Sequence, residues 1–377
     1  MTTGALITRE PVVNQQRAIT ANRLIVHAPN IATALQTLEA QRAHWPTVHP
    51  VFISFGRLVP TPEVLSWQPP ENTLIEIPAP ALQYPQIQDL VRQLHGAGIA
   101  LALSWYQPGT AWPDGVDCRF VLADQSKVAS PAGAPGVPLA WGLANVPAFA
   151  AAVDRGYAGA AGWFFLKGVT PTKELAPSHA QIVRLLNLVR NDADITEIEN
   201  ALKQDVSLPY KLLRYINSVG FGLMVEVQSF RHAVTILGRD KLNKWLSLLL
   251  VSASKDPAAP AVMQAAIARG RMMEILGAHL FDKAQHDNLF ITGAFSLLDV
   301  LLGTGLDAVL DQMTLPDSIR DALLHDDGAY AALLRLAIAS ESFLPDQLRT
   351  QSEALGLTVQ QVSSALLQAV AFADALG

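Results

Sequence analysis

The stretch Gly293-Ala294-Phe295-Ser296-Leu297-Leu298-Asp299-Val300-Leu301-Leu302-Gly303 decides how this chain is interpreted. Its apolar part, residues 295–302, is far shorter than the roughly 20 residues that a helix needs to span a bilayer. The apolar window at residues 246–253 is equally short. We therefore expect both windows to be buried core helices of a compact domain and predict no membrane segment.

The sequence changes character near residue 170. Before this point, short apolar runs rich in Val, Ile and Phe alternate with helical stretches, a pattern typical of a mostly parallel sheet, open or closed into a barrel. The predicted strands are residues 23–27, 51–55, 73–77, 99–104, 120–122, 139–142 and 162–165. The predicted helices of this half are residues 31–42, 84–97 and 146–155.

After this point the pattern is entirely helical. Residues 171–177 carry two prolines and are interpreted as a linker. Three capping boxes, each a helix start in which two side chains cap each other's backbone, are expected in the second half. They pair Ser178 with Gln181, Asp194 with Glu197, and Thr358 with Gln361. We therefore predict an α/β domain at residues 1–170 and an all-α domain at residues 178–377.

Composition limits the classes of partner. The net charge of −6 does not favour nucleic acid as a direct partner, because a surface that follows phosphates is normally basic. The single cysteine, Cys118, excludes an intrachain disulfide and suits a reducing cytoplasm. Residues 1–10 lack the features of a signal peptide, so we expect a cytoplasmic protein.

The opening stretch joins Asp205-Val206-Ser207-Leu208-Pro209-Tyr210-Lys211-Leu212-Leu213-Arg214-Tyr215-Ile216-Asn217-Ser218 and Gly220-Phe221-Gly222 in a recognisable pattern. Together they resemble the HDOD domain, an all-helical output module related to HD phosphohydrolases but without their metal ligands. Residues 1–170 in turn resemble an EAL domain, the barrel-like cyclic di-GMP phosphodiesterase fold. The run Leu74-Ile75-Glu76-Ile77, the run Gly162-Trp163-Phe164-Phe165 and the strand order carry this second resemblance. It implies a bacterial EAL–HDOD signalling protein.

The EAL resemblance also implies two divalent metal ions, held by carboxylates and an amide at strand ends. At most of the matching positions this chain has other residues, while Glu76 and Asp124 are kept. The degenerate positions are Arg23, Ser54, Ser104, Trp105, Leu122, Ala161, and either Trp141 or Ala144.

Arg23 replaces the glutamate that names the family and would repel metal cations. At an effective dielectric constant of ~20, two like charges 4 Å apart cost roughly 4 kcal/mol. We expect Glu76 to pair structurally with Arg23, with residual metal binding as the alternative. The sequence thus predicts no catalytic residue, no metal and no cofactor, and therefore a protein that is not an enzyme.

Two alternatives remain open. Trp105, Tyr106, Trp141 and Arg23 lie at strand ends where they could bind cyclic di-GMP without cleaving it, although a plugged barrel is the preferred interpretation. The other alternative is a residual metal-dependent phosphodiesterase that uses Glu76 and Asp124.

The helical half offers no convincing metal site. His325-Asp326 precedes a glycine and is expected at a helix end or turn. Arg269 and Arg271 are expected to form ion pairs with Glu274 on a helix. We predict an interaction surface at Phe221, Leu223 and Met224, after a glycine loop. The preferred function is therefore that of a catalytically inactive signalling adaptor whose partner is an unknown signalling protein.

Overall fold

The computed structural model describes residues 4–167, 177–202, 230–251, 259–343 and 345–376. The chain divides into two compact units. The first joins Met1–Gly168 with Ile338–Ala371, and the second joins Val169–Ala337 with Phe372–Gly377. The division at residues 171–177 stays a prediction, and the structure adds a C-terminal segment to the first unit.

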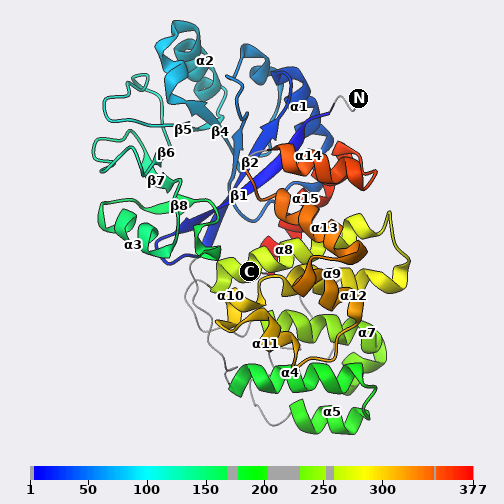
Figure 1. The fold of residues 1–377 in the computed structure, drawn as a ribbon. Coiled ribbons are helices and arrows are strands. Elements are labelled where there is room, and N and C mark those ends of the chain that lie inside the picture. Colours follow the sequence, from blue (N-terminus) through cyan, green and yellow to red (C-terminus); the bar gives the residue numbers. More distant parts are fainter. Residues whose placement is uncertain (1–3, 168–176, 203–229, 252–258, 344, 377) are drawn as a thin grey trace. The chain divides into compact units, whose positions relative to one another are not determined.

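The first unit contains a closed barrel of eight strands in chain order, drawn from blue to green in Figure 1. β2 to β8 run parallel, whereas β1 is antiparallel to both of its neighbours. The strands are β1 (Leu6–Asn14), β2 (Ile19–His27), β3 (Val51–Ser54), β4 (Thr73–Pro78), β5 (Ala100–Ser104), β6 (Phe120–Asp124), β7 (Val137–Trp141) and β8 (Gly159–Ala161). The closed form of the predicted α/β fold is therefore confirmed.

Helices connect the parallel strands on the outside of the barrel (Figure 1). They are α1 (Ile31–Ala40), α2 (Pro85–Gly96) and α3 (Val146–Asp154), close to their predicted ranges. Asn30 and Asn145 begin α1 and α3, since each side chain accepts a hydrogen bond from a backbone N–H in the first turn. Short 3-10 turns at Arg42–His44, Pro62–Ser66, Ala79–Gln83 and Phe164–Leu166 complete this part.

Two strand predictions need correction. Residues 162–165 were expected to form the last strand, but Phe164–Leu166 is a 3-10 turn and β8 precedes it at Gly159–Ala161. The aromatic residues favour a strand by propensity, yet Phe164 stacks on Phe149 at 4.8 Å instead. Gly159 allows β8 to approach β1 closely, because a Cβ there would lie 2.2 Å from the carbonyl oxygen of Val13.

β1 was not predicted at all. It contains Pro11, which has no backbone N–H and therefore argues against a strand. The turn after β1 is held by Asn14, whose side-chain oxygen accepts hydrogen bonds from the backbone N–H groups of Gln16 and Ala18, both at 3.0 Å. This turn lets β2 return along β1, and the other edge of β1 pairs with β8 to close the barrel.

The C-terminal segment of the first unit packs on the barrel. It includes α14 (Pro345–Ala354) and most of α15 (Val359–Asp374), drawn in orange and red beside β1 in Figure 1. Thr358 and Gln361 form the predicted reciprocal capping box at the start of α15. The backbone N–H of Arg9 on β1 donates to the carbonyl of Ser340 at 2.9 Å.

The second unit is helical throughout its described residues, as predicted. Its helices include α4 (Pro177–Arg190), α5 (Ile195–Leu202), α7 (Phe230–Val251), α8 (Ala259–Gly277), α9 (His286–Phe295), α10 (Leu298–Leu302), α11 (Leu306–Leu310), α12 (Asp317–Arg320) and α13 (Gly328–Ala339). A 3-10 turn at Lys283–Gln285 and a π-helical turn at Asp321–His325 join some of them.

Gly293, the first residue of the apolar stretch at residues 293–303, makes the crossing of α8 and α9 close. A Cβ at Gly293 would lie 2.6 Å from the backbone nitrogen of Gly270, and a Cβ at Gly270 would lie 2.6 Å from the carbonyl oxygen of Phe290. Phe290 and Phe295 are fully buried beside this crossing. The glycines thus let the two helices pack backbone to backbone.

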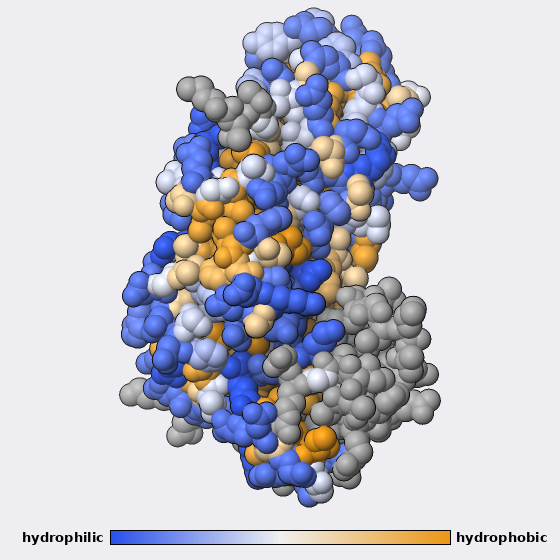
Figure 2. Space-filling model, turned by 90° about the vertical axis from the view of Figure 1, so that its right-hand side faces the viewer, coloured by the Kyte–Doolittle hydropathy of each residue, from blue (hydrophilic) through white to orange (hydrophobic). Residues whose placement is uncertain are grey.

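None of the helices in the described ranges is long and apolar enough to cross a membrane alone. α14 and α15 reach that length and composition only as a pair, and they are bent by 113°. Figure 2 shows hydrophobic residues gathered among hydrophilic ones on the face that it presents.

Candidate functional site

Side chains that point into the barrel are arranged in layers, because strand residues two apart share a face. One layer is apolar and consists of Val12, Ala21, Phe52, Leu74, Ala102, Leu122, Leu139 and Ala161. The next layer lies two residues closer to the carboxyl ends of the parallel strands. Because β1 is antiparallel, its residue in that layer comes two positions earlier in the sequence. This layer, here called the mouth layer, consists of Glu10, Arg23, Ser54, Glu76, Ser104, Asp124 and Trp141.

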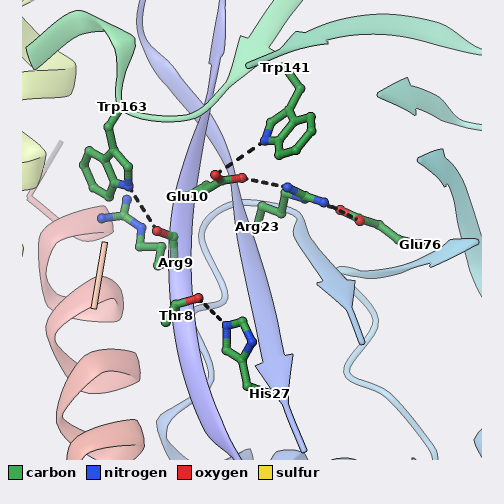
Figure 3. A network of polar contacts seen from close by, with 8 residues as sticks. All are labelled: Thr8, Arg9, Glu10, Arg23, His27, Glu76, Trp141 and Trp163. Carbon is green, nitrogen blue, oxygen red and sulfur yellow. Dashed lines mark hydrogen bonds and ion pairs between the residues drawn. The ribbon is translucent and has the colours of Figure 1, made fainter. Parts of the chain in front are cut away.

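A buried ion cluster lies at the centre of the mouth layer (Figure 3). The guanidinium of Arg23 donates from Nε to Glu76 Oε1 at 2.6 Å and from Nη2 to Glu76 Oε2 at 2.9 Å. Its Nη1 donates to Glu10 Oε2 at 2.7 Å. The three side chains are only 3%, 1% and 8% exposed for Arg23, Glu76 and Glu10. The expected pairing of Glu76 with Arg23 is therefore present, and Glu10 completes it.

The cluster keeps Arg23 protonated. Burial, the largest influence, lowers the pKa of the guanidinium, but the charges and hydrogen bonds of Glu76 and Glu10 raise it above its ordinary value. An ion in a medium of low dielectric constant is costly unless its hydrogen bonds are satisfied. The bidentate contact with Glu76 and the contact with Glu10 meet that requirement.

Aromatic rings cover the cluster. Trp141 donates from Nε1 to Glu10 Oε1 at 3.5 Å, and its ring centroid lies 5.7 Å from the Arg23 guanidinium. Trp105 packs edge-on against Trp141 at 4.6 Å. Phe343, from the C-terminal segment, lies 5.6 Å from Trp141 and 5.9 Å from Arg23. Trp105 has φ of 57°, a strained conformation for a residue of its size at a strand end.

The other positions implied as degenerate metal ligands lie in different parts of the barrel. Ser54 and Ser104 are buried in the mouth layer at 8% and 3% exposure. Leu122 and Ala161 belong to the apolar layer below, so they line the core and do not reach the ion cluster. Ala144 is exposed in the loop after β7.

Asp124 and Tyr106 are also set apart from the cluster. Asp124 bonds the hydroxyl of Ser126 at 2.6 Å and lies 3.3 Å from Lys127 Nζ. The Lys127 ammonium lies 5.9 Å from the Trp105 ring. Tyr106 is 3% exposed and its backbone N–H donates to Leu122.

Sequence reasoning missed Glu10 and Phe343. Glu10 was overlooked because β1 was not recognised, although Thr8, Glu10 and Val12 alternate as inward-facing strand residues do. No local signal places Phe343 at the barrel mouth, since it lies more than 300 residues from β1 along the chain. Only long-range packing of the C-terminal segment brings it there.

The mouth layer does not suit the two divalent cations that an EAL-type barrel implies. Glu76 and Glu10 already accept hydrogen bonds from Arg23, whose positive charge lies between their carboxylates. In the described ranges, no three His, Cys, Asp or Glu side chains are grouped so that they could hold a metal ion. A cation at Glu76 would therefore have to displace the guanidinium.

Polar side chains in the helical unit also form ion pairs. Arg271 Nη1 lies 2.7 Å from Glu274 Oε2, as predicted, and Glu274 also contacts Lys244. Lys244 Nζ lies 3.5 Å from Asp287 and 4.4 Å from the Phe290 ring centroid.

The predicted His325-Asp326 motif and the predicted interaction surface belong to the helical half of the chain. His325 ends the π-helical turn, and Asp326 after it has φ of 52°, so this motif lies in a turn as expected. Phe221, Leu223 and Met224 lie outside the described residues.

Comparison with known proteins identifies a domain within the helical part. Residues 175–299 match the model of the HDOD domain. The cyclic di-GMP phosphodiesterase CdgJ of Vibrio cholerae is 24% identical, and the match spans 96% of this chain and 91% of that protein. The uncharacterised protein YuxH of Bacillus subtilis is 25% identical over 51% of this chain and 48% of that protein. The solved EAL domain of FimX from Pseudomonas aeruginosa, bound to c-di-GMP, is 14% identical, covers 44% of this chain and 90% of its own length, and has a TM-score of 0.33.

The predicted EAL–HDOD architecture is confirmed by the HDOD match, the closed barrel before it and a relative that aligns along both parts. The prediction that the chain is not an enzyme is wrong, because that relative is named a phosphodiesterase. The prediction weighed each motif position separately and counted Glu76 and Asp124 as the acids that are kept. It did not foresee Glu10, which places a second carboxylate on Arg23.

Proposed function

We propose that this chain works in cyclic di-GMP signalling and that cyclic di-GMP is the ligand of its barrel. The observation that carries the proposal is the alignment of nearly the whole chain with a protein named a cyclic di-GMP phosphodiesterase. The chemistry of the barrel mouth supports it. Trp105 and Trp141 offer aromatic faces to a planar base, and Lys127 beside them offers a cation to a phosphate.

Hydrolysis of cyclic di-GMP is the second candidate function, and the name of the same relative favours it. Glu10 and Glu76 are the acids at the centre of the mouth layer. Each is now bound to Arg23, so hydrolysis requires that at least one carboxylate is released from the guanidinium. We derive no catalytic step through a metal ion, since the donor set does not suit one.

One titration separates these functions. Cyclic di-GMP is added to the full chain in a calorimeter, and linear dinucleotide is measured in parallel with Mg²⁺ or Mn²⁺ present. Binding that weakens in Lys127→Gln supports the ligand, and metal-dependent turnover that is lost in Glu76→Gln supports hydrolysis. Binding without turnover rejects hydrolysis alone, whereas neither binding nor turnover rejects both functions.

We further propose that the helical part passes the signal to another signalling protein by direct contact. The HDOD match supports an output role, and Phe221, Leu223 and Met224 remain the predicted contact surface. A pull-down from the native organism with wild type and with Phe221→Ser/Met224→Ser tests it. A partner that both proteins capture equally well rejects this surface. The cytoplasmic location also stays a prediction.

A further inference from the structure

A cleft of about 440 Å³ opens within the barrel unit beside the mouth layer. One wall comes from the residues at and after the ends of β2 and β3, and the other comes from the start of α14. Its volume falls within the usual range of about 300–1,000 Å³ for small-molecule sites. The lining includes His27, Phe55, Arg57, Phe343, Asp346 and Arg349.

The cleft has an excess of positive charge. Arg57 comes from the loop after β3 and Arg349 from α14, and neither has an ion-pair partner among the described residues. Asp346 is the one acidic residue in the lining. His27 adds no charge at neutral pH, because burial, together with the charges of Arg349 and Arg57, lowers its pKa to about 4 against the opposing effect of Asp346.

The remaining lining is apolar and suits a compact ring. Phe55 is 3% exposed, and the half-buried ring of Phe343 lies 6.5 Å from His27 in an edge-on arrangement. Pro29 and Pro345 add to the same lining. A ligand that fills the cleft therefore needs an apolar, planar body as well as negative charge.

We propose that this cleft binds a small organic phosphate monoester, with its phosphate held by Arg57 and Arg349 and its ring against Phe343. A phosphate monoester carries a charge of about −1.5 to −2 at pH 7 and has three acceptor oxygens, so it can serve two guanidinium groups at once. A carboxylate matches only one such fork. The site goes beyond the proposed function, since it uses neither the ion cluster nor Trp105.

Phenyl phosphate is the probe for this site, with inorganic phosphate and benzoate as comparisons, and calorimetry on the full chain as the measurement. We expect binding of phenyl phosphate to weaken at least about tenfold in Arg57→Gln and in Arg349→Gln, because each removes a charge-assisted hydrogen bond. Arg92→Gln, an exposed surface arginine on α2, is the matched control and should bind as the wild type does. Saturation with phenyl phosphate should also raise the pKa of His27, measured by NMR.

Three results would overturn the proposal: no binding, equal binding by Arg57→Gln and the wild type, or benzoate binding as tightly as phenyl phosphate. Arg57 is exposed, so its replacement keeps the test valid even if Arg349→Gln does not fold. Cyclic di-GMP is not needed at any step. Its failure to bind would reject the proposed function and leave this site standing.

Discussion

Arg23 reverses the charge of a position where the resemblance implied a glutamate, and its surroundings explain how the fold tolerates it. The guanidinium is enclosed by Glu76 on β4 and Glu10 on β1, and all three side chains are removed from water. A buried pair of this kind contributes little net stability compared with apolar residues of the same shape. Removal of one partner is nevertheless costly, because it leaves an uncompensated charge. Arg23 is thus required by its partners.

Arg23→Met should lower the free energy of unfolding by about 3–5 kcal/mol, since it leaves two carboxylates buried together. Urea denaturation of the full chain gives this number. The triple variant Arg23→Met/Glu10→Gln/Glu76→Gln is the control and should regain most of the loss. A loss below about 1 kcal/mol in the single variant would show that water already reaches the carboxylates.

His27 should make the barrel less stable in acid. Its pKa is about 4 in the folded protein against 6.5 ordinarily, because of burial and the charges of Arg349 and Arg57. Between these values the unfolded chain binds more protons, so stability is fully present above pH 6.5 and is lost as pH falls toward 4. At about 1.4 kcal/mol per pKa unit, the loss is on the order of 1 to 3 kcal/mol.

The comparison that isolates His27 is urea denaturation of wild type and His27→Gln at pH 7 and pH 4.5. The variant should show the smaller loss, while His95→Gln on α2 should behave as the wild type does. An equal pH dependence in all three proteins would assign the acid sensitivity to other groups.

At the scale of the elements, the sequence predicted those that follow their own periodicity. α1, α2, β3 and β4 lie within a residue or two of their expected bounds. β1 and β8 were not predicted, because Pro11 and the small residues Gly159–Ala161 oppose a strand by local propensity. Their pairing with each other is a tertiary effect that closes the barrel.

The same limit applies to the candidate site. Arg23, Glu76 and Trp141 were named from the EAL resemblance, and Arg23 contacts both Glu76 and Trp141. Leu122 and Ala161, which the resemblance implied as degenerate metal-site positions, lie one layer lower in the apolar core. A shift of two residues keeps a side chain on the same face of its strand but moves it to another layer, and the resemblance alone does not resolve that difference.

The segment before α14 should contribute to the barrel mainly through Phe343. A double-mutant cycle between Phe343→Ala and Trp141→Ala should give a coupling of about 0.5–1.5 kcal/mol, since their rings are 5.6 Å apart. Trp67, which packs on Trp45 away from this contact, supplies the control. Phe343→Ala and Trp67→Ala should be additive. An additive result for Phe343 and Trp141 as well would mean that the ring contact contributes nothing to stability.

At the scale of the whole molecule, the sequence predicted two parts of different character but not their composition. The segment Ile338–Ala371 reads as ordinary amphipathic helix, and its periodicity does not reveal which core it covers. In the structure it joins the barrel. In sequence, the first unit therefore consists of one segment before and one segment after most of the helical unit, an order that no local signal encodes.

This arrangement predicts that residues 1–170 alone form an incomplete barrel unit. Truncation removes the carbonyl of Ser340 that Arg9 bonds on β1 and the helices beside it, and it leaves Ala5 and Leu6, now fully buried, without part of their cover. Exposure of such apolar surface costs about 25 cal/mol per Å². The fragment should therefore melt well below the barrel transition of the full chain and bind a hydrophobic dye.

Addition of the separately expressed fragment 171–377 supplies Ile338–Ala371 in trans and should raise that melting temperature. The same fragment truncated after Ala337 is the matched control, because it keeps the HDOD match but lacks the segment. It should leave the melting temperature of residues 1–170 unchanged. If residues 1–170 alone melted like the barrel of the full chain, the C-terminal segment would merely rest on a complete domain, and the boundary predicted at residues 171–177 would describe the folding units correctly.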